Sequence, residues 1–177
     1  ARFTLQAGGY ALVVPGGGSA HPGAEDAPAI VASAAHAIAR RGVPTLLVGS
    51  DAAGAGGERP ALLKVAPRLP PPELIELIRT ARLVVCNGGD TLLQVLACDL
   101  PCVAVPIAHD QAHRIECCVR AGLAVRAELH PRAIESAALA VLEQGRRPVG
   151  GEPRAGQPRV RNRMEEVLKA LTDMLER

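Results

Sequence analysis

Residues 83–91 form the stretch Leu-Val-Val-Cys-Asn-Gly-Gly-Asp-Thr. Its first four residues form a short apolar run without polar alternation, which is typical of a strand buried on both faces of a sheet. The Asn-Gly-Gly that follows breaks the strand, and the apolar residues 92–98 favour a helix. A buried strand that turns directly into a helix indicates a unit of a parallel α/β sheet.

The same alternation continues in both directions along the chain. Short β-branched runs alternate with longer stretches rich in Ala and Leu, which predicts an α/β fold with a parallel sheet of about six strands and helices on both faces. The predicted strands are residues 10–14, 45–48, 62–65, 83–86, 101–105 and 124–126. The predicted helices are residues 27–41, with Asp26 as the candidate N-cap, and 73–80, 92–98, 109–121 and 131–143.

The chain divides into two parts on composition. Residues 1–145 are predicted to form one α/β domain, and 146–177 to form a linker rich in Gly, Pro and Arg followed by an amphipathic helix. The apolar face of that helix would contain residues 160, 164, 167, 168, 171 and 175. The chain begins at Ala1 rather than at a methionine, which favours a piece of a longer protein.

Composition excludes several classes of function. The 177 residues are 48% hydrophobic with a net charge of +2, which suits one soluble domain and does not indicate a polyanionic partner. Phe3 and Tyr10 are the only aromatic residues, so recognition of nucleic acid by base stacking is not expected. No apolar run is long enough to span a bilayer. Contact of the basic C-terminal segment with an anionic membrane surface stays open as an alternative.

The cysteines indicate a reducing compartment. Their number is five, an odd set without the spacing of a small disulfide scaffold, so we expect free thiols in a cytoplasmic protein. His109, His113 and Cys117 are spaced four apart on one predicted helix. The first and last would lie more than about 10 Å apart along the axis, so we expect no metal site.

Three polar loops follow the predicted strands at their carboxyl ends, where parallel α/β sheets bind ligands. The first contains Gly17, Gly18 and Ser19, the second spans residues 88–91, and the third contains Asp110 and Gln111. Glycines allow the backbone to approach a ligand, and a helix N-terminus attracts phosphate. Together the loops predict a diphosphate flanked by polar groups, as in a nucleotide-sugar.

Purely structural interpretations of the same loops stay open. Glycine-rich turns are common after strands, and Asp110 could cap the helix that begins nearby. The first loop is neither a dinucleotide fingerprint, which would need a small residue in place of His21, nor a Walker A loop, because no Gly-Lys-Ser/Thr follows.

The order of these motifs resembles a known family. Residues 86–94 read Cys-Asn-Gly-Gly-Asp-Thr-Leu-Leu-Gln; Asp-Leu-Pro follows at 99–101, Val-Ala-Val-Pro at 103–106 and Asp-Gln at 110–111. This succession is similar to the donor-binding half of GT-B glycosyltransferases over residues 10–143. The family's motif begins with His where this chain has Cys86, and an Asn often stands where it has Arg114.

The resemblance implies one Rossmann-like half of a GT-B fold in a glycosyltransferase whose donor is a sugar linked to uridine or thymidine diphosphate. It implies no essential metal or cofactor, and a catalytic base supplied by an N-terminal acceptor domain that this chain lacks. No catalytic residue is therefore assigned, although His21 is a candidate near the cleft. The resemblance implies that the protein contacts four parts of the donor: the diphosphate, the base through the backbone at Leu69, the ribose through Gln94, and the sugar. The implied donor-binding residues are Gly17, Gly18, Ser19, Leu69, Gly88, Gly89, Asp90, Thr91, Gln94, Asp110 and Gln111.

Two other functions share this architecture. One is a nucleotide-sugar epimerase of the same fold, which would need acid and base groups around the sugar. The other is a non-catalytic subunit that binds a nucleotide-sugar and pairs with a separate acceptor-domain chain.

Overall fold

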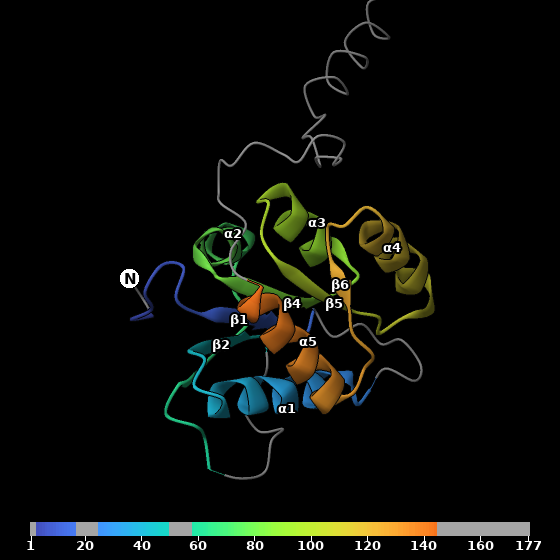
Figure 1. Cartoon of the computed structure of the whole chain (residues 1–177). Helices are drawn as coiled ribbons and strands as arrows, with labels where there is room; N and C mark the ends of the chain where they lie inside the picture. Colours follow the sequence, from blue (N-terminus) through green and yellow to red (C-terminus); the bar gives the residue numbers. More distant parts are fainter. Residues whose placement is uncertain (1–2, 17–24, 50–57, 145–177) are drawn as a thin grey trace, which may run out of the picture.

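The computed structural model describes residues 3–16, 25–49 and 58–144, which form one three-layer α/β structure (Figure 1). The strands are β1 (Ala11–Val14), β2 (Thr45–Val48), β3 (Leu63–Ala66), β4 (Leu83–Asn87), β5 (Cys102–Val105) and β6 (Val125–Arg126). The helices are α1 (Ala27–Arg40), α2 (Pro71–Thr80), α3 (Asp90–Ala97), α4 (His109–Arg120) and α5 (Pro131–Glu143).

The sheet confirms the predicted architecture. Its six strands run in the order β3-β2-β1-β4-β5-β6, and every neighbouring pair is parallel. The order reverses direction at β1 and β4, which is where an open α/β sheet forms a ligand crevice. The predicted C-terminal helix and the linker before it lie outside the described residues.

Two details at the helix starts differ from the predictions. Helix α2 begins at Pro71 rather than at Glu73, because proline fits the first turn of a helix, where an N–H group has no intrahelical acceptor anyway. Asp26 does occupy the N-cap position of α1, but it makes no capping hydrogen bond through its side chain. Its backbone is already helical at φ −82° and ψ −12°, whereas a capping residue normally has an extended backbone.

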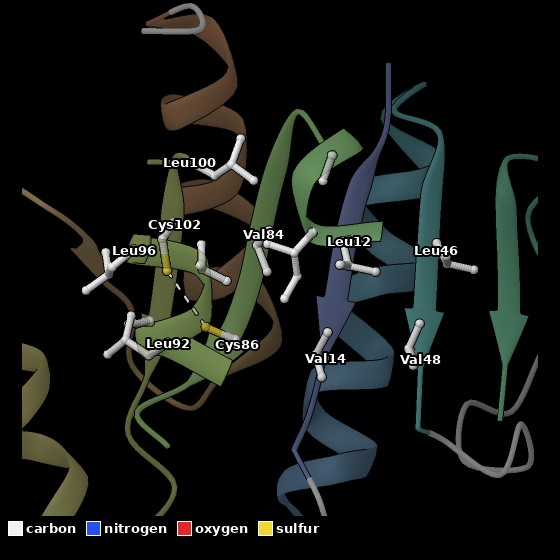
Figure 2. Packing of buried hydrophobic residues seen from close by; sticks show 14 of the residues in the cluster. Leu12, Val14, Leu46, Val48, Val84, Cys86, Leu92, Leu96, Leu100 and Cys102 are labelled. Carbon is white, nitrogen blue, oxygen red and sulfur yellow. Dashed lines mark hydrogen bonds between the residues drawn. The ribbon is translucent and has the colours of Figure 1, made fainter. Parts of the chain in front are cut away.

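Each face of the sheet packs against its own layer of helices. Side chains alternate along a strand, so Ala11 and Val13 contact the layer of α1 and α5, while Leu12 and Val14 contact the opposite layer. Figure 2 shows that second layer, where Leu92 and Leu96 of α3 pack against β4 and β5. Small residues dominate α1, which allows helix and sheet to approach closely.

The five cysteines are all free thiols in the structure. Cys86 and Cys102 lie in neighbouring strands with their Sγ atoms 3.7 Å apart (Figure 2). The hydrogen bond with Cys86 and burial together raise the pKa of Cys102 well above its ordinary value. Cys86 is itself buried in this apolar layer. No helix among the described residues has the length and apolar character that crossing a membrane requires.

Asp99, just after α3, allows a test of whether its left-handed backbone lowers the stability of the protein. It is the one non-glycine residue of the described chain with a left-handed backbone, at φ 54°. That conformation costs an L-residue roughly 1 kcal/mol, which a glycine would not lose. Part of this gain is offset, because glycine makes the unfolded chain more flexible and so favours unfolding. We expect Asp99→Gly to raise the melting temperature by a few degrees in calorimetry. Asp99→Ala, the matched control, should not; equal melting temperatures for the two variants would contradict this account.

Candidate functional site

The parallel register brings three loops to one edge of the sheet. Val14 pairs with Cys86, so the chain leaves β1 at Pro15 beside the point where it leaves β4. Asn87 in turn pairs with Val105, so the loop from β5 to α4 begins next to the same turn. Pro15, Gly88 and Pro106, the first residues after β1, β4 and β5, therefore lie at the carboxyl end of the central strands, while Gly17, Gly18 and Ser19 lie outside the described residues.

Asn87, the last residue of β4, contacts both central loops. Its Oδ1 accepts a hydrogen bond from the Gly89 N–H at 3.1 Å, and its Nδ2 donates to the carbonyl of Pro15 at 3.4 Å. Gly16 adjoins the same side chain: a Cβ added there would lie 2.2 Å from Nδ2, and its φ of +98° already favours glycine. Asn87 therefore ties the end of β1 to the turn that begins α3.

Gly88 is held from the side of α4. The Oε1 of Gln111 accepts hydrogen bonds from the N–H groups of Gly88, at 3.1 Å, and Ile107, at 3.2 Å. The guanidinium of Arg114 donates to the Gly88 carbonyl at 2.6 Å. A Cβ on Gly88 would lie 2.8 Å from the Cβ of Gln111 and 2.9 Å from Cδ1 of Ile115. Close packing therefore requires glycine at this position.

Two backbone donors remain available at the start of α3. The N–H groups of Gly88 and Gly89 are already used by Gln111 and Asn87. Those of Asp90 and Thr91 lie in the first helical turn, which has no intrahelical acceptors, and within the described chain they have no other partner. No side chain caps this helix. Its end therefore offers two N–H groups and the positive end of the helix dipole to an anion.

The same helix carries an unsatisfied polar atom. The Oε1 of Gln94 is buried and has no hydrogen-bond partner among the described residues. Leaving such an acceptor without a donor costs about 1–3 kcal/mol. A ligand hydroxyl at this position would remove that cost, so Gln94 is suited to binding a polyol such as a ribose.

The charges near the turn are of both signs. Asp90 is exposed in the first turn of α3, where its carboxylate interacts favourably with the helix dipole but repels an incoming anion. Arg114 is half-buried and forms no ion pair within the described ranges. Its positive charge at the Gly88 carbonyl therefore partly offsets Asp90.

The other predicted site residues fall into three groups. Gly17, Gly18, Ser19 and His21 lie outside the described residues. Leu69 is 7% exposed and packs in the layer of α2 and α3; it lies on the loop after β3, and two strands, β2 and β1, separate β3 from β4. Asp110 is exposed in the first turn of α4 and makes no capping bond, since the N-cap position is Ala108.

Gln111 has a structural task that the sequence did not reveal. Its side chain was predicted to hold a sugar, yet it is 6% exposed and its carbonyl oxygen is engaged by two backbone N–H groups. Only its amide nitrogen is left for a ligand. No metal-binding group of three His, Cys, Asp or Glu side chains exists in the part of the chain that the structure describes.

Sequence reasoning also missed the role of Asn87. A signal was present, because Asn often bonds the backbone N–H two residues on and so forms turns, as it does here with Gly89. Its second contact, with Pro15, joins residues 72 positions apart and depends on the strand order. Local sequence does not contain that information.

Comparisons with known proteins give matches only among solved structures: no family model matches the sequence, and no curated protein does. The spinosyn rhamnosyltransferase SpnG, complexed with thymidine diphosphate, is similar with a TM-score of 0.62 and 19% identity, over 79% of this chain and 39% of that one. The glycosyltransferase of kitacinnamycin gives a TM-score of 0.58 and 23% identity over 78% and 36%.

A UDP-GlcNAc 2-epimerase of Methanocaldococcus jannaschii, in complex with UDP-GlcNAc and UDP, gives a TM-score of 0.59 and 12% identity. The match covers 92% of this chain and 45% of the epimerase. This chain thus spans less than half the length of each of these proteins. The likeness confirms the predicted fold: a Rossmann-like parallel α/β sheet that corresponds to one half of the GT-B fold.

Proposed function

We propose that this chain is the donor-binding part of a glycosyltransferase that takes a sugar from a nucleoside diphosphate sugar. The observation that carries the proposal is the N-terminus of α3, beside the end of β1, where the N–H groups of Asp90 and Thr91 have no partner within residues 3–16, 25–49 and 58–144. Amides at a helix N-terminus are suited to a phosphate group. The neighbouring Gln94 carbonyl, which receives no donor from the same residues, is suited to a ribose hydroxyl.

The remaining donor contacts are proposals from the resemblance. Gly17, Gly18 and Ser19 would contact the diphosphate from the loop after β1, and Leu69 would offer its backbone to the base. Asp110 and the free amide nitrogen of Gln111 would contact the sugar. UDP and dTDP are the nucleotides we propose, and thymidine diphosphate and UDP also occur in the similar structures.

The chemistry that this end of the sheet can supply is stabilisation of a leaving group. When the bond from sugar to diphosphate breaks, negative charge grows on the phosphate oxygens. Fixed N–H groups and the dipole of α3 would stabilise that charge most in the transition state, because they need no reorganisation. The acceptor site and a general base would come from residues outside this chain, which spans 36–45% of the three similar proteins described above.

A nucleotide-sugar epimerase is the second candidate. The match to the UDP-GlcNAc 2-epimerase covers 92% of this chain, against 78–79% for the two glycosyltransferases. An epimerase needs acid and base groups at the sugar, and Asp110 and His109 are the exposed groups of that kind at the start of α4. Product analysis of the longer protein with UDP-GlcNAc separates the two, because transfer releases UDP and epimerisation does not.

Binding of a nucleoside diphosphate by the 177-residue chain is the first test. A ligand that binds only the folded state at 100 times its dissociation constant stabilises it by about 2.7 kcal/mol. We expect UDP or dTDP to raise the melting temperature by roughly 5 °C or more, and uridine or thymidine to raise it less. A melting temperature that no nucleoside diphosphate changes at millimolar concentration would overturn the proposal.

Substitutions at Gln94 and Thr91 test the contacts from α3. Gln94→Met removes a buried acceptor without a partner, so it should stabilise the free protein while weakening nucleotide binding by roughly 3- to 10-fold. Thr91→Val keeps the backbone N–H and removes the side-chain hydroxyl, which we expect to donate to the same phosphate, so it should weaken binding to a similar extent. Thr45→Val is the control, because Thr45 is a buried residue at the opposite end of the sheet that bonds the Val43 carbonyl. Calorimetric titration with unchanged affinity in both α3 variants would count against these contacts.

The carboxylate of Asp90 tests whether a negative charge at the α3 terminus weakens the binding of a diphosphate. If a diphosphate binds at the α3 terminus, Asp90 repels it, with an energy of about 1 kcal/mol at 4 Å in water. Asp90→Asn should therefore tighten binding several-fold at low ionic strength, and the gain should shrink as salt is added. Weaker binding by Asp90→Asn would show instead that the carboxylate accepts a hydroxyl of the ligand.

A further inference from the structure

The Asn87 side chain joins two segments that the proposed diphosphate site uses from opposite sides. One is the end of β1, through the carbonyl of Pro15 at 3.4 Å; the other is the N-cap residue of α3, through the N–H of Gly89 at 3.1 Å. Both polar atoms of the side chain are thus engaged within the protein. Asn87 is therefore placed to orient the binding groups, and one of the two N–H donors of its Nδ2 has no other partner among the described residues.

The number of free donors makes this orientation important. Gln111 and Asn87 occupy the N–H groups of Gly88 and Gly89, which leaves Asp90 and Thr91 as donors at the α3 terminus. Two adjacent N–H groups suit one phosphate group. A second phosphate must then be held from elsewhere. Gly16, at the end of β1, adjoins the Asn87 side chain, and its N–H group has no hydrogen-bond partner among the described residues.

Gly16 shows how tightly the two segments are set. Its backbone is left-handed at φ +98°, and a Cβ there would meet Nδ2 of Asn87 at 2.2 Å and its Cγ at 3.0 Å. Gly89 is close on the other side, since its Cβ would lie 3.1 Å from Oδ1. The side chain of Asn87 thus fills the space between two glycines, and no larger residue fits at Gly16 while Asn87 keeps this position.

We propose that Asn87 is a positioning residue that sets the spacing between the end of β1 and the N-terminus of α3, and that this spacing makes the site select a diphosphate over a monophosphate. The proposal rests on the proposed nucleotide-binding function. Without Asn87, the α3 terminus would still bind one phosphate, because the N–H groups of Asp90 and Thr91 are unchanged and that of Gly89 is released. The contribution of the second phosphate would be lost, because the two segments would no longer be held in register.

The test is isothermal titration of the 177-residue chain with UDP and UMP, and in parallel with dTDP and dTMP. For the wild type, we expect the diphosphate to bind more tightly than the monophosphate. In Asn87→Ala, the affinity for the diphosphate should fall roughly tenfold, and that for the monophosphate by less than about threefold. The readout is the dissociation constant of the monophosphate divided by that of the diphosphate. General destabilisation of the protein would change both constants alike and leave this ratio unchanged.

Three other variants separate positioning from stability. In Asn87→Ser, the hydroxyl can still accept the Gly89 N–H but is too short to reach Pro15. This variant should therefore recover stability without recovering the preference for the diphosphate. It also replaces Asn87→Ala if that variant does not fold. Gly16→Ala displaces the Asn87 side chain from the other segment and should lower the same ratio. Tyr10→Phe is the control. Tyr10 lies just before β1, and its hydroxyl donates a 2.6 Å hydrogen bond to the Leu77 carbonyl. Loss of this bond should leave the ratio unchanged.

The outcomes distinguish the two proposals. If the wild type binds a nucleoside diphosphate and the ratio in Asn87→Ser and Gly16→Ala equals that of the wild type, the positioning role is wrong and Asn87 serves the fold alone. If the wild type binds neither nucleotide of either pair, the proposed function fails, and the positioning role fails with it. A lowered ratio in both variants, with Tyr10→Phe unchanged, would support both.

Discussion

The parallel pairing of β1 with β4 is the constraint on which the rest of the site depends. These strands are adjacent in the sheet, although their first paired residues, Ala11 and Leu83, lie 72 positions apart in the sequence. Because they run in the same direction, their carboxyl ends meet, and so do the loops that follow them. A glycine-rich loop and a helix N-terminus are common features separately. Pro15 and Gly16 at the end of β1 adjoin the turn that begins α3, so further backbone lies beside a helix N-terminus that is suited to an anion.

Most of the polar groups in the turn after β4 serve to hold the turn itself. The N–H and carbonyl of Gly88 are both bonded by α4, through Gln111 and Arg114, and the N–H of Gly89 is bonded by Asn87. A turn fixed on both sides is preorganised, so its two free N–H groups would pay little entropy when an anion binds. The limited number of free donors also explains why the neighbouring loop matters.

The electrostatics of this edge depart from the pattern that the sequence resembles. Cys86 occupies the position of the family's histidine, and it lies in the apolar layer with Cys102, where it offers no positive charge. Arg114 brings a cation to the same turn from α4, by bonding the Gly88 carbonyl. The positive charge at the turn thus comes from the neighbouring helix rather than from the end of β4, and it offsets the exposed carboxylate of Asp90.

The class of fold and nearly every element could be predicted from the amino-acid sequence, because buried strands and helices carry apolar patterns that are local in the chain. The run at 83–86 and the Gly-Gly turn after it are examples, and the bounds agree with the structure to within about two residues. The sequence could not assign the tasks of Gln111 and Asn87, since polar residues at strand ends suit a ligand and a backbone group equally well. Only the tertiary structure decided between them, because the hydrogen-bond partners of these side chains, Gly88 for Gln111 and Pro15 for Asn87, lie 23 and 72 residues away and are brought near by the strand order.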